Sequence, residues 1–224
     1  MINLTNLTSH IRETIPIKLI VTSALSIGAG GSTGSLADKA IVRNARGQMI
    51  IPGSHLKGRL RHECEKIGTS LGWEIYYAPL PAFLCPDTST CAQYKLDGYR
   101  GFHCPISQIF GDPFLPSRII VDDLICELGE TEEVIRPGVT INRYLHTAED
   151  RKLYYTETSP VAAELEFIGQ IHITKSAPLY TKALLISALR QIKNLGGSKS
   201  AGMGWVKWYI DNLEESDSSW SELG

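Results

Sequence analysis

The sequence predicts an α+β fold of the split βαβ type. Segments in which apolar residues alternate with polar ones, as in strands, are separated by two segments with helical periodicity. Their order along the chain is strand, helix, strands, helix, strand, with insertions after the first helix and in the middle. A length of 224 residues fits one domain that carries large insertions.

The first half of the chain predicts a strand, a short hairpin and a helix. Residues 15–28 place apolar side chains at every second position, and a Gly/Ser loop follows over Gly28–Ser35. Arg46-Gly47 predicts a hairpin turn. Residues 51–68 predict a helix in which Ser54 is the N-cap and the apolar residues form a buried stripe. The stripe consists of Leu56, Leu60, Cys64 and Ile67.

The second half predicts a long hairpin and a strand–helix–strand unit. Residues 118–124 predict a short strand. Residues 134–157 predict two long arms with a polar turn near Ala148–Asp150, and their exposed-type side chains indicate that the hairpin projects from the body. The final strand, helix and strand are predicted at residues 165–174, 180–194 and 203–210.

Residues 69–115 form an irregular insertion that is too long for an ordinary loop in a compact domain. Three cysteines lie in it, and thiolates together with an imidazole are the usual ligands of structural zinc. A zinc ion would supply the stability that the insertion otherwise lacks. The candidate thiolate ligands are Cys85, Cys91 and Cys104.

The fourth zinc ligand is open at this point. His62 is the first candidate, because it lies on the side of its helix opposite the leucine stripe, where the insertion can fold over it. His103 is adjacent to Cys104, which makes ligation by both awkward, and Cys64 fits the core better. The spacing of the cysteines is not that of a C-x-x-C pair, so thiols without a metal are the alternative.

Composition and charge exclude several classes of protein. No run of about 20 apolar residues is present, which argues against a membrane span, and the first residues lack the pattern of a signal peptide. A cytoplasmic location is therefore expected, and an odd count of five cysteines argues against a disulfide framework. The net charge is −2, but residues 211–224 carry five acids and no base, which leaves 22 basic against 19 acidic residues in 1–210.

Two segments carry the residue types that bind phosphate. Residues 196–204 contain four glycines around Lys199, so backbone amides can approach a ligand closely. Residues 52–61 begin a helix, whose N-terminus attracts anions, and place Lys57 and Arg61 on one side of it. The alternatives are a glycine-rich turn for the first segment and a solvated basic helix face for the second.

Asp38 is a candidate metal-binding or catalytic residue. It lies in a flexible loop, where an acid beside a phosphate track can bind a metal ion or assist attack at a phosphodiester. A solvated turn residue is the alternative reading of a single loop aspartate.

Taken together and in this order, these motifs resemble the RAMP superfamily of CRISPR-associated proteins. Within the superfamily, the sequence resembles the repeated backbone subunit of type III (III-A/III-D-like) effector complexes. The resemblance covers nearly the whole chain, and its most specific elements are a PGSxLKGxLR motif followed by GGxKSxGxG. The matching segments are Ala24–Gly31, Asp38 before Ile41–Asn44, Ile51–Arg61, Cys104–Pro113, Arg118–Asp123, Ile141–Glu157 and Leu195–Val206.

The resemblance implies a modified ferredoxin-like (RRM-like) core over residues 1–210, a thumb hairpin at about 132–160 and an acidic tail at 211–224. Several copies and other effector subunits would assemble along one CRISPR RNA (crRNA) and its complementary target RNA. Asp38 matches the aspartate that cleaves target RNA with Mg²⁺, and the insertion is where some members bind Zn²⁺. The implied RNA-binding residues are Ser54, Lys57, Arg61, Arg136, Arg143, Gly197, Lys199 and Ser200.

Two other functions fit the sequence. The first is a structural subunit that binds crRNA but does not cleave. The second is an unrelated small-molecule enzyme that uses the glycine-rich loop to hold a nucleotide phosphate. Guide binding has to be independent of sequence, which calls for contacts to the RNA backbone from lysine, arginine, serine and amide groups. Those residue types are the ones present in the two phosphate-binding segments.

Overall fold

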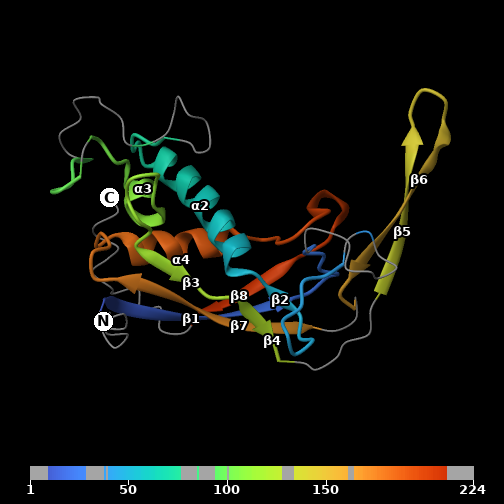
Figure 1. Cartoon of the computed structure of the whole chain (residues 1–224), viewed down its shortest axis with the longest axis horizontal. Coiled ribbons are helices and arrows are strands. Elements are labelled where there is room, and N and C mark those ends of the chain that lie inside the picture. The colour runs from blue at the N-terminus through green and yellow to red at the C-terminus, as the bar shows by residue number, and fades with distance from the viewer. Residues whose placement is uncertain are drawn as a thin grey trace.

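A computed structural model gives the fold of the chain (Figure 1). It describes residues 10–28, 38, 40–76, 85, 94–99, 101–127, 134–160 and 164–210. Cys91 and the acidic tail at 211–224 lie outside the described residues, as does most of the predicted Gly/Ser loop. Within the described part of the chain, no helix is both long and apolar enough to cross a membrane.

The main sheet is antiparallel, and its strands follow the order β2-β4-β7-β1-β8, with β3 also paired to β7. This order places the last strand beside the first, as in a ferredoxin-like fold, and confirms the α+β prediction. The strands are β1 (Ile11–Val21), β2 (Ile50–Ile51), β3 (Ile119–Val121), β4 (Leu124–Cys126), β7 (Leu165–Thr174) and β8 (Val206–Ile210).

Two helices, α2 (Gly53–Ser70) and α4 (Thr181–Gln191), cover one face of this sheet (Figure 1). The period-two pattern of β1 turns Ile15, Ile17 and Leu19 toward the helices, and all three are buried. The predicted apolar stripe of α2 is confirmed at Leu56, Leu60 and Cys64, which are fully buried, whereas its fourth member, Ile67, is only partly buried. The core therefore lies between one sheet face and the α2–α4 pair.

Part of the predicted insertion belongs to this core. Helix α3 (Pro105–Phe110) lies within residues 69–115, and every one of its residues is buried. Phe102 before the helix and Leu115 after it are also buried. The expectation that residues 69–115 are irregular throughout was therefore wrong at their C-terminal end, because the apolar residues of a six-residue helix are too few to show a clear helical period.

The long hairpin consists of β5 (Val134–Asn142) and β6 (Thr147–Thr158), and it projects away from the sheet (Figure 1). The predicted turn near Ala148–Asp150 was wrong, since the structure places the turn at residues 143–146. The Asn142 side chain explains this position, because its Oδ1 accepts hydrogen bonds from the amides of Tyr144 and Leu145, both at 3.0 Å.

Other boundaries differ from the predictions by a few residues. The strand predicted at 15–28 begins at Ile11 and ends at Val21, although Leu25 and Ile27 beyond it are buried as expected. The segment 118–124 contains β3 and the start of β4, which Asp122 and Asp123 separate. The strand predicted at 165–174 is confirmed, with the same bounds.

Candidate functional site

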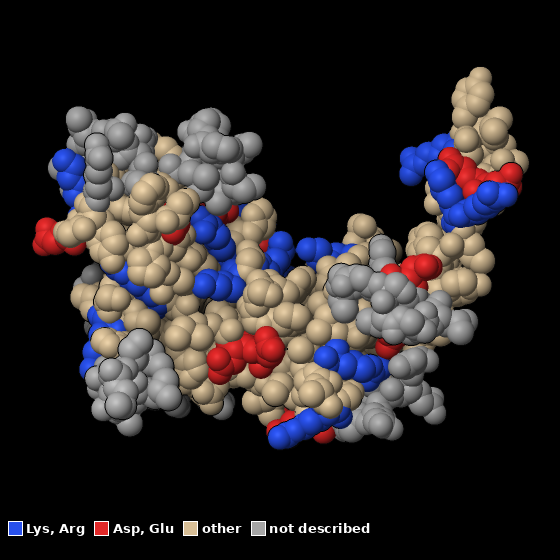
Figure 2. All heavy atoms as spheres, in the orientation of Figure 1, with Lys and Arg blue, Asp and Glu red and all other residues tan. Residues whose placement is uncertain are grey.

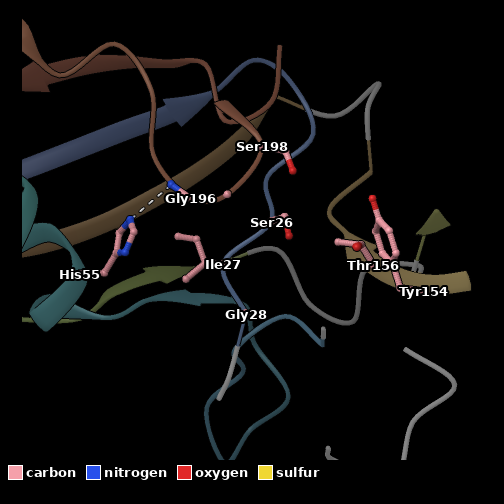
Figure 3. A pocket seen from close by; sticks show the side chains of 9 residues that line it. Ser26, Ile27, Gly28, His55, Tyr154, Thr156, Gly196 and Ser198 are labelled. Carbon is pink, nitrogen blue, oxygen red and sulfur yellow. Dashed lines mark hydrogen bonds between the residues drawn. The ribbon is translucent and has the colours of Figure 1, made fainter. Parts of the chain in front are cut away.

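A pocket of about 390 Å³ lies between the glycine-rich loop and the base of the hairpin (Figure 3). One wall is formed by His55 in the first turn of α2 and by residues 196–198 of the loop. Residues 26–28, which follow β1, form the floor, and Tyr154 and Thr156 of β6 face it from the hairpin. Four segments that are distant in sequence therefore meet at one polar cavity.

His55 joins the two predicted phosphate-binding segments. Its Nε2 accepts a hydrogen bond from the backbone amide of Gly196 at 3.3 Å (Figure 3). The pKa of His55 lies below its ordinary value, first because the ring is partly buried and then because Lys199 and Arg59 are nearby cations. Burial and the nearby cations therefore favour the neutral ring, whose Nε2 can accept the bond.

The glycine-rich loop is held against residue 26. The amide of Gly197 donates a hydrogen bond to the carbonyl of Ser26 at 2.7 Å, so this amide is already used within the protein. Gly196 has a φ of +84°, and a Cβ at this position would lie 2.5 Å from the same carbonyl oxygen. A larger residue would push the loop away from the pocket floor.

Lys199 and Ser200 lie in a 3-10 turn (Lys199–Ala201) and are exposed. The loop closes at Gly204, whose amide donates to the carbonyl of Ala24 and whose carbonyl accepts from the amide of Leu195. Lys199 therefore presents its charge to solvent from a loop that the protein backbone holds at both ends.

The start of α2 differs from the prediction. The N-cap is Pro52, and Ser54 is an exposed residue inside the helix, so the assignment of Ser54 as N-cap was wrong. The side chain of Asp123 caps the start of α2 instead, because its Oδ1 accepts a hydrogen bond from the amide of Gly53 at 2.7 Å. The carboxylate neutralises part of the positive helix end, so an anion here has to be held largely by side chains.

Lys57 and Arg61 lie on the same side of α2, as predicted, and both contact the segment around α3. The Lys57 ammonium donates to Ser117 Oγ at 2.7 Å. Arg61 pairs with Glu65 at 3.0 Å and donates to the carbonyl of Gly111 at 3.1 Å. The pKa of Lys57 is lowered, first by burial and then by the charge of Arg61. Figure 2 shows Lys and Arg side chains along the hollow beside α2.

Asp38 lies against the edge of the hairpin base. Its amide donates to the carbonyl of Tyr155 at 2.9 Å, and its Oδ2 accepts from the amide of Tyr155 at 2.7 Å. Tyr154 and Thr156, the neighbours of Tyr155 in β6, line the pocket. The predicted catalytic aspartate is therefore bonded to the strand that carries two pocket-lining residues, but it does not itself line the pocket.

The two predicted hairpin arginines lie far apart. Arg136 is paired in register with Thr156, so it lies at the hairpin base near the pocket. Arg143 is in the exposed turn at the other end of the hairpin. The structure brings only Arg136 close to the pocket.

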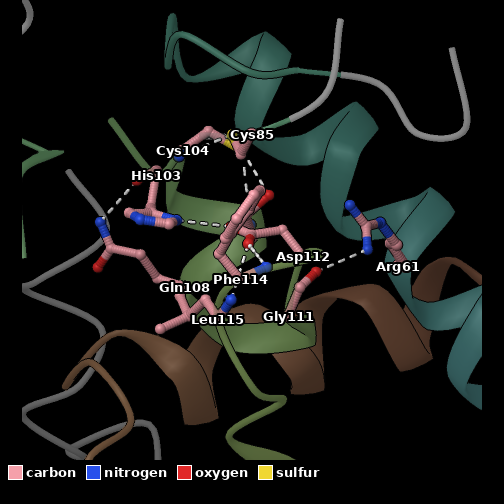
Figure 4. A network of polar contacts seen from close by, with 10 residues as sticks. Arg61, Cys85, His103, Cys104, Gln108, Gly111, Asp112, Phe114 and Leu115 are labelled. Carbon is pink, nitrogen blue, oxygen red and sulfur yellow. Dashed lines mark hydrogen bonds and ion pairs between the residues drawn. The ribbon is translucent and has the colours of Figure 1, made fainter. Parts of the chain in front are cut away.

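Cys85 and Cys104 meet beside α3 (Figure 4). The amide of Cys104 donates to Cys85 Sγ at 3.3 Å, and Cys104 Sγ lies 3.3 Å from Ser107 Oγ. These neighbours lower the pKa of Cys104 to about 6, chiefly through the Cys85 thiol, whose own pKa is raised by the same contact.

The structure does not bring the four proposed zinc ligands together within its described part. His62 is exposed on α2 and Cys64 is buried in the core, while Cys91 lies outside the described residues. No three His, Cys, Asp or Glu side chains among the residues described form a metal-binding group. His103 Nδ1 lies 2.6 Å from Asp112 Oδ2, and its buried Nε2 has no hydrogen-bond partner there (Figure 4).

Sequence reasoning missed His55, Ser26, Tyr154 and Thr156 as pocket residues. His55 carried one usable signal, because a side chain in the first turn of a helix lies near whatever approaches that helix end. The other three carry no local signal, since they reach the pocket only through the pairing of distant segments.

The fold and the pocket define a ferredoxin-like α+β protein with a projecting hairpin and a cavity that presents the hydroxyls of Ser26, Thr156 and Ser198 to a polar ligand. Residues 18–207 match the model of the RAMP superfamily, and the chain belongs to that superfamily. It is therefore a CRISPR-associated protein of a family that works in RNA–protein complexes, and its class of ligand is RNA. No curated protein matches the sequence.

Proposed function

We propose that this protein is the repeated backbone subunit of a type III CRISPR effector complex, which binds crRNA and cleaves complementary target RNA at Asp38. The observation that carries the proposal is the position of Asp38, which is bonded to Tyr155 between the two hairpin residues that line the pocket. An RNA strand held in the pocket would pass beside this carboxylate. Family membership favours an RNA ligand over the small-molecule substrate considered above.

The chemistry of the pocket suits a ribose-phosphate backbone. Hydroxyls of Ser26, Thr156 and Ser198 can hydrogen-bond to phosphate or ribose, and Lys199 adds a charge beside them. These groups do not read base edges, which is what a subunit that accepts any guide requires. Lys57, Arg61 and Arg136 would extend the contact outside the pocket, and Ser54 and Ser200 are exposed near pocket-lining residues in the sequence.

The carboxylate of Asp38 is a suitable ligand for the Mg²⁺ ion that cleavage would require. Mg²⁺ is commonly held by one or two carboxylates together with substrate phosphates and water, so a single aspartate beside the strand can suffice. The ion would polarise the scissile phosphate and stabilise the charge that develops on it. The contacts of Asp38 with the Tyr155 backbone hold the carboxylate next to the strand that carries Tyr154 and Thr156.

We also propose that Cys85 and Cys104 contribute to a structural zinc site, with Cys91 as a third ligand. The donor pair fits a thiophilic cation, because zinc binds the thiolate form and the pKa of Cys104 is lowered to about 6. The exposed position of His62 gives no support to its role as fourth ligand. His103 offers a buried Nε2 without a described partner, and Asp112 orients its ring.

The test of the proposed function compares two substitutions of Asp38 in the assembled complex with its bound guide. Asp38→Asn removes the negative charge but keeps an oxygen that can accept the Tyr155 amide, whereas Asp38→Ala removes both. Both variants should retain crRNA and lose target cleavage in Mg²⁺ by a factor of about 10² or more. Asp150→Ala, at an exposed hairpin position, is the control and should cleave normally.

Cleavage that persists at this subunit's positions in Asp38→Asn would show that the catalytic role is wrong and leave the structural crRNA-binding subunit. A complex that purifies without RNA of defined length would contradict guide binding itself. The two parts of the proposal are therefore tested separately.

A further inference from the structure

A second pocket, also of about 390 Å³, lies at the end of the main sheet where β1 and β3 begin and β7 ends. Its lining contains three basic side chains, from His10, Arg118 and Lys175, together with hydroxyl groups and the ring of Tyr99. The described lining includes no acidic residue. None of these residues lines the pocket beside the glycine-rich loop.

The backbone fixes the three basic residues next to one another. The amide of Lys175 donates to the carbonyl of His10 at 2.7 Å, and the amide of Thr174 donates to the carbonyl of Arg118 at 3.0 Å. His10 and Arg118 thus flank the end of β7, one on each side, at the spacing of neighbouring strands. Backbone hydrogen bonds at the end of the sheet therefore fix the turns that carry the charged residues Arg118 and Lys175.

Tyr99 supplies an aromatic ring that His103 supports on one side. Its ring packs edge-on against His103, with centroids 6.0 Å apart, and His103 is in turn bonded to Asp112 at 2.6 Å (Figure 4). The ring is 40% exposed, so one part contacts the protein while another part faces solvent. A tyrosine that is supported in this way can act as a stacking platform.

The combination of these groups indicates a nucleotide. Arginine and lysine beside hydroxyls bind phosphate, and an exposed aromatic ring stacks on a base. A small inorganic anion would make no use of Tyr99, and the absence of acidic groups from the described lining excludes a cationic ligand. The pocket is large enough for a base as well as a phosphate.

A contact of Lys57 links this pocket to the RNA-binding surface of the proposed function. Ser117 lines the pocket, and its Oγ accepts the hydrogen bond from Lys57 in the first turns of α2. His55, two residues earlier in the same helix, lines the pocket beside the glycine-rich loop. The first turns of α2 therefore contact both pockets, although His55 and Lys57 point to different sides of the helix because residues two apart lie about 200° around it.

We propose that the second pocket holds one nucleotide of an RNA strand that continues from the first site, with its base on Tyr99 and its phosphate between Arg118 and Lys175. The inference rests on the proposed function in so far as the same RNA occupies both pockets. Stacking on Tyr99 would add a contact to a base, whereas the first pocket contacts only the RNA backbone. This contact would not select a particular base, because every base can stack.

The test measures binding of fluorescein-labelled U20 RNA to the full chain by anisotropy over a range of salt concentrations. The double variant Arg118→Gln/Lys175→Gln should reduce the magnitude of the slope of log K against log salt by about 0.7, because it removes the contact to one phosphate of a single strand. Tyr99→Ala should weaken binding about tenfold, and Tyr99→Phe, which keeps the ring, should not. Lys207→Gln, at an exposed position on β8, is the matched control.

Lys199→Gln separates this inference from the proposed function. If Lys199→Gln weakens binding while the double variant and Tyr99→Ala keep the wild-type affinity and salt slope, the second pocket is not an RNA contact and the first site stands. If none of the variants changes binding, or the wild-type chain binds no U20, both proposals fail. Ultraviolet crosslinking of 4-thiouridine RNA gives a second readout, in which the crosslinked peptide should contain Tyr99.

Discussion

The backbone amide of Gly196 donates a hydrogen bond to Nε2 of His55 at 3.3 Å, and this contact joins two segments that are 141 residues apart. One is the first turn of α2 and the other is the glycine-rich loop before β8. Each segment alone is an ordinary structural motif. Their contact creates the wall of the pocket, so the properties of His55 control how the two halves of the site fit together.

The free energy of unfolding should fall as the pH is lowered from about 7.5 to 5.5, and His55 should contribute to the fall. The pKa of His55 in the folded protein lies below the ordinary value of about 6.5, so the unfolded chain takes up the proton first. The stabilising effect of neutral His55 is thus complete above pH 6.5 and is lost as the pH falls through the folded pKa.

Urea unfolding of the wild type and His55→Gln across this pH range measures the effect. Glutamine can still accept the Gly196 amide but does not titrate, so the variant should show a weaker pH dependence. His62→Gln, at an exposed position of the same helix, should leave the dependence unchanged. Parallel pH curves for the wild type and His55→Gln would contradict the assignment.

Gly204→Ala should destabilise the protein by about 3 kcal/mol or more. Gly204 has a φ of +70°, and a Cβ at this position would lie 1.8 Å from the carbonyl oxygen of Leu195, so the backbone would have to move. Gly202 has a similar φ of +83° but no atom within 4 Å of its Cβ position. Gly202→Ala should therefore cost only the conformational strain of about 1–2 kcal/mol. Equal urea midpoints for the two variants would show that the contact between Gly204 and the Leu195 carbonyl does not add to the cost of the substitution.

Asp123→Ala should cost about 1 kcal/mol, because it removes the acceptor for the Gly53 amide at the start of α2. Asp123→Asn keeps an oxygen acceptor, and its cost should be smaller. Thermal unfolding followed by circular dichroism distinguishes the two. Identical losses in both variants would mean that the charge of Asp123, rather than the hydrogen bond, stabilises the helix end.

Elemental analysis of the purified full chain should find close to one equivalent of zinc. Cys85→Ser/Cys104→Ser should lower the zinc content by removing two thiolate ligands, whereas Cys126→Ala, at a buried core position of β4, should retain it. Removal of zinc by a chelator should destabilise the segment around α3. A fully folded wild-type protein without bound metal would refute the zinc proposal.

Much of the fold was predictable because strands and helices leave local periodic patterns. The bounds of β7, the buried stripe of α2 and the presence of the projecting hairpin all follow from the spacing of apolar and polar residues. Where the pattern was short, the prediction failed. Helix α3 has only six residues, all of them buried, which is too short for a clear helical period. The position of the hairpin turn depends on hydrogen bonds to the Asn142 side chain and not on the most polar residues.

What the sequence alone determined is the order of the elements, the α+β class and the residue types available for binding phosphate. The tertiary structure alone decided that Asp38 bonds to Tyr155 in the hairpin, that Asp123 rather than Ser54 holds the start of α2, and that His55 meets Gly196. The physical reason is that each of these contacts joins residues far apart in the chain. Their formation depends on how sheet and helices pack, and no local periodicity encodes that packing.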